Sequence, residues 1–215
     1  MLQNMHKYKP YVGMRIPDQV FENIYAANLD PYGYTSSDYE RQKYSATLAA
    51  LSRDRYTKAF EIGCSIGVLT RLLGERCDSL LSVDIVESAL QQARQRCASE
   101  HNVTFARMRV PDNWPSDTFD LIVISEVFYY LTVSELNQLA QRLRSSLVPS
   151  GEILLVHNRW TGMLLPQWLQ RSIPVLSKAN RRHDRVIALI SDFARVISHE
   201  QHNEYRLDLL RRIEP

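Results

Sequence analysis

The sequence predicts an α/β fold in which helices cover both faces of a doubly wound, mostly parallel sheet of seven strands. Short apolar segments alternate with helix-forming segments through most of the 215 residues, a pattern typical of parallel sheets. The continuous apolar run at 119–125 is typical of a central strand buried on both faces. Two further apolar segments, at 194–199 and 205–210, are expected to close the sheet as an antiparallel hairpin.

Two helices are predicted before the first strand. Apolar residues recur at helical spacing around residues 20–25, which predicts a short helix there. Ser37, with Glu40 three residues later, has the pattern of a capping box and predicts the start of a second helix that ends near residue 51.

The remaining elements alternate along the chain. Further strands are predicted at residues 58–62, 80–83, 103–108 and 152–157. Helices are predicted at residues 67–75, 87–100, 133–147 and 160–178. Pro149 is expected to stop the third of these helices, and Pro166 and Pro174 to interrupt the last, because proline cannot continue a helix.

The turn after the first predicted strand is the most informative segment. It runs from Glu61 through Gly63, Ser65 and Gly67, and Asp84 follows the second predicted strand. Small residues let the backbone approach a ligand, and an acid after the second strand can accept hydrogen bonds from two ribose hydroxyls. These features favour a nucleoside-binding site over a strand–helix turn that binds no ligand.

The spacing in this turn distinguishes between nucleoside ligands. A dinucleotide turn needs G-x-G-x-x-G, but Val68 stands where the third glycine belongs. Glu61 would repel a pyrophosphate, whereas it suits a cation. S-adenosylmethionine (SAM) carries an ammonium and a sulfonium, so the turn favours SAM, and a nucleotide-dependent oxidoreductase is the alternative from another enzyme class.

Several segments resemble a known family. Residues 59–70 are similar to motif I of the class I SAM-dependent methyltransferases, whose Rossmann-like topology the predicted element order matches. The segments that resemble the nodulation methyltransferase (NodS) group are Asp30-Pro31-Tyr32, Tyr39-Glu40-Arg41-x-Lys43-Tyr44, Ser125-Glu126-Val127-x-Tyr129-Tyr130, Leu147-x-Pro149-x-Gly151 and Glu204-Tyr205-Arg206-Leu207-Asp208. The resemblance covers most of residues 28–158. It implies transfer of the SAM methyl group to the free amine of a deacetylated amino-sugar oligomer, with S-adenosylhomocysteine (SAH) as the product.

The resemblance also implies a division of the chain. Residues 1–51 are expected to form an N-terminal helical lid, and residues 52–215 the SAM-binding Rossmann-like domain, within one structural unit. The tyrosine-rich part of the lid is expected to close over the cofactor and exclude water.

The site residues are expected where the central strands end, since doubly wound sheets bind ligands there. The expected cofactor contacts are Glu61, Gly63, Cys64, Ser65, Gly67, Asp84, Ile85, Met108, Val110 and Ser125. The expected acceptor contacts are Tyr32, Tyr34, Tyr129, Tyr130 and Asn158. Glu126 and His157 are the candidate general bases, and their alternatives are a helix-capping carboxylate and a structural histidine. No metal is expected.

Two positions depart from the NodS pattern. Ser65 replaces the central glycine of motif I, which a small side chain is expected to tolerate. Arg109 replaces an acid that accepts from the adenine amino group, so adenine is expected to be bound by backbone near Met108 and Val110, or by Asp112. Lys43, like Arg41, is interpreted as ordinary helix surface.

The composition excludes several classes of protein. A net charge of +2 gives no overall attraction to nucleic acid or anionic membranes, and no apolar run approaches the ~20 residues of a membrane span. The three cysteines have neither a disulfide pattern nor zinc-ligand spacing. We therefore expect a cytoplasmic enzyme with a small-molecule or oligosaccharide acceptor. An O-methyltransferase of a sugar or natural product and a noncatalytic SAM-binding module remain alternatives, and the oligomeric state stays open.

Overall fold

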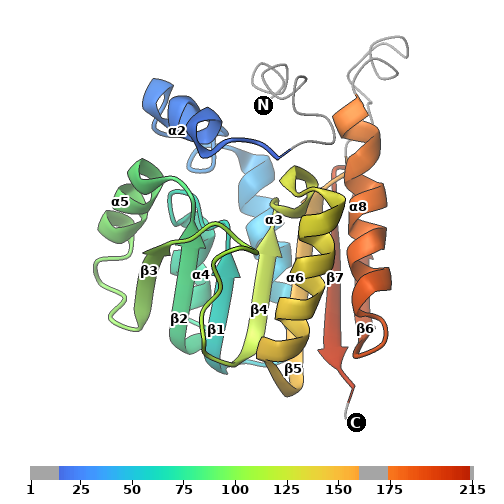
Figure 1. Cartoon of the computed structure of the whole chain (residues 1–215). Helices are drawn as coiled ribbons and strands as arrows, with labels where there is room; N and C mark the ends of the chain where they lie inside the picture. The colour runs from blue at the N-terminus through green and yellow to red at the C-terminus, as the bar shows by residue number, and fades with distance from the viewer. Residues whose placement is uncertain (1–14, 160–173, 214–215) are drawn as a thin grey trace.

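A seven-stranded sheet forms the centre of the protein in the computed structural model, which describes residues 15–159 and 174–213 (Figure 1). The strands are β1 (Tyr56–Ile62), β2 (Cys77–Asp84), β3 (Val103–Arg107), β4 (Phe119–Ser125), β5 (Leu147–Asn158), β6 (Ala194–Gln201) and β7 (Tyr205–Arg212). Their order is β3-β2-β1-β4-β5-β7-β6, in which β1 to β5 pair in parallel. β7 pairs antiparallel with both β5 and β6. This topology confirms the predicted doubly wound sheet and its closing hairpin.

Helices cover both faces of the sheet (Figure 1). They are α2 (Asp18–Ala27), α3 (Asp38–Ala49), α4 (Val68–Gly74), α5 (Glu87–Arg96), α6 (Val133–Ser146) and α8 (Pro174–Ile190), with a 3₁₀ turn, η2 (Phe128–Tyr130). Helices α6 and α8 share one apolar cluster with one face of the sheet. Helices α3 and α4 share a second cluster with the other face, and α2 packs beside α5 in a third.

Strand β4, which ends at the site, is packed on both faces. Leu121, Ile122, Val123 and Ile124 are all fully buried. Ile122 and Ile124 pack toward α6 and α8, whereas Leu121 and Val123 pack toward α3 and α4. Each such burial contributes about 1.5–3 kcal/mol, so the strand end that carries Ser125 is held from both sides.

The helix starts follow capping chemistry. The Ser37 hydroxyl accepts the Glu40 N–H at 3.4 Å, which confirms the predicted start of α3. Thr132 and Glu135 form a reciprocal capping box at the start of α6, at 3.2 and 2.8 Å. These caps satisfy backbone donors that a helix leaves unpaired at its first turn.

Several element boundaries differ from the sequence prediction, and those of β5 and α8 differ most. Strand β5 begins at Leu147, immediately after α6, and includes Pro149, whereas a strand was expected only from residue 152. Its register with β4 shifts between Phe119 and Leu121, which accommodates the extra residues. Helix α8 runs from Pro174 to Ile190. Pro174 begins this helix and does not interrupt it, because proline fits the first turn of a helix. Residues 160–173 of the predicted 160–178 helix lie outside the described residues.

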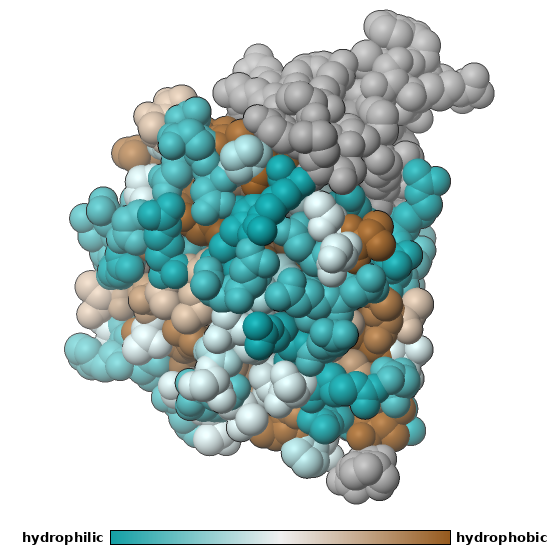
Figure 2. Space-filling model, viewed as in Figure 1, coloured by the Kyte–Doolittle hydropathy of each residue, from teal (hydrophilic) through white to brown (hydrophobic). Residues whose placement is uncertain are grey.

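The surface in Figure 2 is mainly hydrophilic on the face shown, with apolar residues in small separate patches. Within the described ranges, 15–159 and 174–213, no helix combines the length and apolar character needed to cross a bilayer.

Candidate functional site

A cavity that is partly open to solvent lies where β1 and β4 end. Its lining residues are Tyr34, Glu40, Lys43, Tyr44, Glu61, Gly63, Cys64, Ser65, Ile66, Val68, Leu69, Ser125 and Glu126. They come from the turn after β1, from the end of β4 and from the N-terminal segment with α3. Segments far apart in the sequence therefore meet at the edge that the sequence pattern indicated.

The other predicted cofactor residues do not line this cavity. Asp84 is one hydrogen bond away, because its carboxylate accepts the Ser65 N–H at 2.9 Å. Ile85 packs against the apolar cluster that α2 shares with α5. Val110 is buried in the cluster beneath α6, and Met108 packs against the same cluster. The side chain of Val110 thus packs in the core. The Met108 N–H already donates to the Asp84 carbonyl at 3.0 Å.

The glycines of the turn are required by packing. Gly63 has φ +82°, and a Cβ there would lie 2.2 Å from Val127 Cγ2. Gly67 has φ +78°, and a Cβ there would lie 2.8 Å from the Ala93 Cβ on α5. Any side chain would therefore push β4 or α5 away from the turn.

Substituting alanine for Gly67 is expected to destabilise the protein by roughly 2–4 kcal/mol. The left-handed backbone contributes about 1–2 kcal/mol of this cost, and the clash with Ala93 contributes the rest. Urea unfolding measures the loss. Gly33→Ala is the matched control, because Gly33 has φ +73° but its added Cβ would meet only Ser36 Oγ, at 3.7 Å. Equal losses in the two variants would show that the contact with α5 contributes nothing.

Ser65 is more constrained than the sequence predicted. It has φ +50°, a left-handed conformation that a small size alone does not make favourable. Its hydroxyl lies 2.5 Å from the Tyr25 hydroxyl, so a side chain of α2 is bonded to the turn. Serine therefore lacks the conformational freedom of glycine at this position, but its hydroxyl makes a specific contact with the N-terminal region.

Two acidic residues give this edge of the sheet its electrostatic character. Glu61 is 1% exposed and accepts from Thr70 Oγ1 at 2.6 Å and Ser82 Oγ at 2.7 Å. Burial raises the pKa of Glu61 to about 7, although these hydroxyls act in the other direction. Burial also raises the pKa of Asp84, against the N–H groups of Val86 and Ser65. Glu61 has no ion pair with any described Lys or Arg, so this carboxylate is buried without a compensating cation.

Glu126 is held from several sides at the end of β4. Its φ is +60°, and its N–H donates to the Val156 carbonyl at 3.0 Å. One carboxylate oxygen accepts from Lys43 Nζ at 3.0 Å. The other accepts from the Tyr129 hydroxyl at 2.9 Å and the Asn158 N–H at 3.1 Å. The predicted candidates Glu126, Tyr129 and Asn158 therefore form one hydrogen-bonded group.

Lys43 is buried, and its interpretation as helix surface is wrong. Its side chain is 1% exposed, whereas that of Arg41 is 61% exposed. Glu40, Lys43, Tyr44 and Thr47 are all buried and follow a helical spacing along one side of α3. That spacing was the available signal, but polar residues at core positions resemble a solvent-exposed face in sequence.

His157 lies on the other side of β5 and does not line the cavity. It is fully buried, with its ring 4.3 Å from that of His183 and 5.4 Å from that of Phe128. His183 in turn contacts the buried carboxylate of Asp208 at 2.5 Å. The structure therefore places His157 in a packed aromatic and polar cluster, which corrects its expected position among the residues at the site.

The predicted tyrosines lie close together. Tyr32 and Tyr34 have ring centroids 5.4 Å apart, and those of Tyr129 and Tyr130 are 4.4 Å apart. Tyr34 lines the cavity, and Tyr130 packs edge-on against Phe21 of α2.

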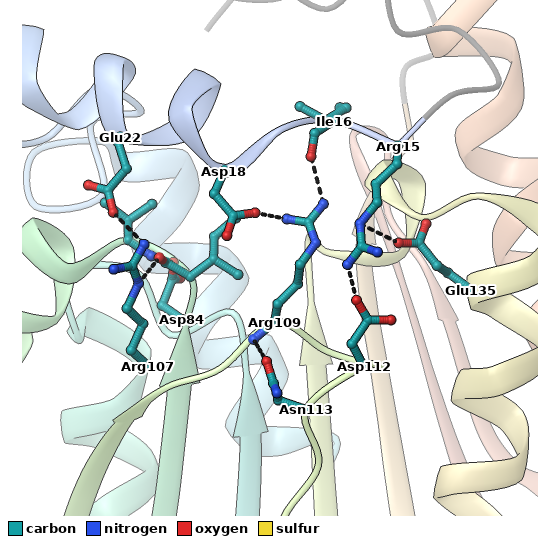
Figure 3. Close-up of polar contacts among 12 residues, drawn as sticks. Arg15, Ile16, Asp18, Glu22, Asp84, Arg107, Arg109, Asp112, Asn113 and Glu135 are labelled. Carbon is teal, nitrogen blue, oxygen red and sulfur yellow. Dashed lines mark hydrogen bonds and ion pairs between the residues drawn. The ribbon is translucent and has the colours of Figure 1, made fainter.

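Arg109 binds the N-terminal segment (Figure 3). Its guanidinium donates to the Ile16 carbonyl at 2.6 Å and pairs with Asp18. Beside it, Asp112 pairs with Arg15, which also lies 3.3 Å from Glu135. The departure from the NodS pattern at Arg109 thus ties the segment before α2 to the loop after β3. Asp112, one expected reader of adenine, is already engaged in this arrangement.

No group of three or more His, Cys, Asp or Glu side chains suited to a metal ion occurs in the part of the chain that the structure describes. Cys64, Cys77 and Cys97 are buried free thiols. Burial raises the pKa of the Cys64 thiol well above its ordinary value, which fits a packing role.

Comparison with known proteins gives concordant matches. The model of the family described as Nodulation protein S (NodS) matches residues 18–161. Nodulation protein S of Sinorhizobium fredii (strain NBRC 101917 / NGR234) is 32% identical over 127 residues, which make up 58% of this chain and 59% of that protein. The chain thus spans about three fifths of the length of the curated relatives it matches.

Two solved structures share the fold. A putative methyltransferase from Pseudomonas syringae is 33% identical, with a TM-score of 0.65, and the match covers 81% of this chain and 99% of that one. The N-methyltransferase NodS from Bradyrhizobium japonicum WM9, in complex with SAH, is 22% identical, with a TM-score of 0.74. That match covers 91% of this chain and 98% of the other.

Proposed function

Because the chain belongs to the nodulation protein S (NodS) family, we propose that it transfers a methyl group from SAM to the free amine of an amino-sugar acceptor. The observation that carries the proposal is the pair of acids at the ends of β1 and β2. Glu61 is a buried carboxylate beside a cavity, and it has no cationic partner among the described residues. Asp84 lies next to the same turn.

These residues fit the charges and hydroxyls of SAM. Glu61 would face the ammonium or sulfonium, which would supply the missing positive charge. Asp84 would accept from the ribose hydroxyls, as acids do after the second strand of such sheets. The turn from Gly63 to Gly67 would lie along the ligand.

The acceptor would lie beside Glu126. This carboxylate lines the cavity on the β4 side, across the turn from Asp84. It would accept a hydrogen bond from the acceptor amine and stabilise the positive charge that develops on nitrogen. Tyr34, Tyr32, Tyr129, Tyr130 and Asn158 are the residues we assign to the acceptor side.

The chemistry needs a neutral amine held in line with the methyl group. When bound, SAM would supply a methyl group on a sulfonium: the amine would form a bond to the methyl carbon, the S–C bond would break to release SAH, and the positive charge would pass to the amine nitrogen. Alignment of this kind can be worth ~7–11 kcal/mol. The N-terminal segment through α3 would act as a lid that excludes water during the reaction.

A transfer assay with a short chitooligosaccharide that carries one free amine tests this function. We expect SAH to form together with a product heavier by one methyl group, attached at nitrogen in its NMR spectrum. The fully acetylated oligosaccharide is the matched control, because it keeps the hydroxyls and lacks the amine. Methylation of both compounds at oxygen would contradict amine specificity, and failure to bind SAH would contradict the cofactor assignment.

The affinity for SAH is expected to fall as the pH decreases below about 7. In the free protein Glu61 has a raised pKa of about 7, so it takes up a proton below that pH. The SAH ammonium favours the ionised form, so binding releases this proton, and affinity falls by up to about tenfold per pH unit. Calorimetry in buffers of different ionisation enthalpy measures both effects. Glu61→Gln should abolish the proton release, and an unchanged release in that variant would assign it elsewhere.

A further inference from the structure

A buried ionic group links α3 to the acceptor side of the cavity. Lys43 Nζ donates to Glu40 Oε1 at 3.0 Å and to Glu126 Oε1 at 3.0 Å. The side chains are 1%, 2% and 10% exposed for Lys43, Glu40 and Glu126. Nζ also lies 5.1 Å from the centroid of the Tyr39 ring, which covers another side of the ammonium.

The ammonium in this group keeps its charge. Burial opposes a positive charge on Lys43, but Glu126 and Glu40 together raise its pKa above the ordinary value. Burial raises the pKa of Glu40, and Lys43 acts against that shift. One ammonium therefore pairs with two carboxylates. Removing it would leave two acids close together in a poorly solvated site.

The Glu126 carboxylate is held by hydrogen-bond donors on both of its oxygens. Lys43 holds one carboxylate oxygen, while the Tyr129 hydroxyl and the Asn158 N–H hold the other. The side chain thus has donors on both oxygens and a left-handed backbone, and it lines the cavity. A carboxylate fixed in this way is pre-organised to accept one more hydrogen bond from a ligand.

We infer that Lys43 is a positioning residue for the acceptor amine: it holds the Glu126 carboxylate in a fixed orientation, so that Glu126 accepts a hydrogen bond from the nucleophile. The inference rests on the proposed function, because it assigns a role within that reaction. In this role Lys43 acts through Glu126, which its ammonium contacts directly.

A double-mutant cycle tests this role with the mono-amine chitooligosaccharide. Lys43→Met is expected to lower kcat/KM for the acceptor by roughly 10²-fold, while the Kd for SAH changes less than about threefold. Lys43→Arg, which keeps the charge, should recover most of the rate. Lys43→Met combined with Glu126→Gln should be no slower than Glu126→Gln alone, because the lysine has no effect without its carboxylate. Independent, multiplying losses would overturn the inference.

Arg41→Met is the matched control for removing a cation from α3. Arg41 lies two residues before Lys43 on α3, is exposed, and pairs only with exposed Asp38 and the Ser36 carbonyl among its described polar contacts. Its loss should leave both kcat/KM and the Kd for SAH near the wild-type values. A rate loss equal to that of Lys43→Met would indicate a general effect of the helix charge.

A spectroscopic measurement keeps the inference testable with any acceptor. In protein labelled with ¹³C at the glutamate carboxyl groups, Glu126→Gln identifies the Glu126 signal. We expect this signal to move in Lys43→Met, because the carboxylate loses the charged hydrogen-bond donor on one of its oxygens. An unchanged Glu126 signal in folded Lys43→Met would overturn the inference, whatever the activity. If wild type binds SAH and methylates no amine while the signal moves, the proposed acceptor fails and the inference on Glu126 stands.

Discussion

Glu126→Gln is expected to methylate an amine acceptor roughly 10²- to 10³-fold more slowly than the wild type, with little change in the affinity for SAH. Glutamine preserves the shape of the side chain and one acceptor oxygen. It removes the charge that would stabilise the ammonium forming on the acceptor. The loss should fall on kcat, because the charge matters most when the N–C bond forms. Steady-state kinetics with SAH calorimetry separates the two effects.

Two further variants sharpen this experiment. Tyr129→Phe removes one of the three described donors to Glu126 and leaves the charge, so it should lose less than Glu126→Gln. His157→Phe should keep most of the rate, because His157 is buried against Phe128 and His183. If Glu126→Gln stays fast and the folded His157 variant is slow, the base is His157 and our assignment is wrong.

Asp84→Ala is expected to weaken SAH binding by roughly 10- to 150-fold. Charge-assisted hydrogen bonds to the two ribose hydroxyls would be lost, at a cost of about 1.5–3 kcal/mol. The carboxylate also accepts from the N–H groups of Ser65 and Val86, so the empty turn would lose support as well. Calorimetry with SAH gives the affinity, and thermal unfolding shows how much of the loss is structural.

Asp78→Ala is the control for this variant. Asp78 lies on the same strand, is 55% exposed and pairs with Arg55. Its removal should leave SAH binding unchanged. An Asp84→Ala variant that bound SAH as tightly as the wild type would remove the ribose assignment.

The sequence predicted the sheet because its signals are local. The run from Phe119 to Ser125 matches β4 at both ends, since full burial on two faces requires a continuous apolar segment. The start of α3 at Ser37 was equally predictable, since a cap depends on residues three positions apart. The turn after β1 was predictable for the same reason.

The partners of the site residues could not be predicted in this way. Whether Lys43 faces solvent or protein depends on which side of α3 packs against the sheet, and Glu126 is 83 residues away in the chain. His157 was expected at the site because it nears the end of a strand, but alternate residues of a strand point to opposite faces. The conformation of Ser65 could not be predicted either, because its neighbour Tyr25 comes from a separate helix.

The burial of Lys43 also has a consequence for the chemical reactivity of the protein. Acylating reagents and acetyltransferases need an amine within reach, and Lys58, with 43% of its side chain exposed, is accessible to them although it pairs with Asp117. Lys43 offers neither access nor a free lone pair while α3 stays packed and both carboxylates hold its protons. Lys43 would therefore be modified only when α3 separates from the sheet, and the rate of its modification would report how often the site opens.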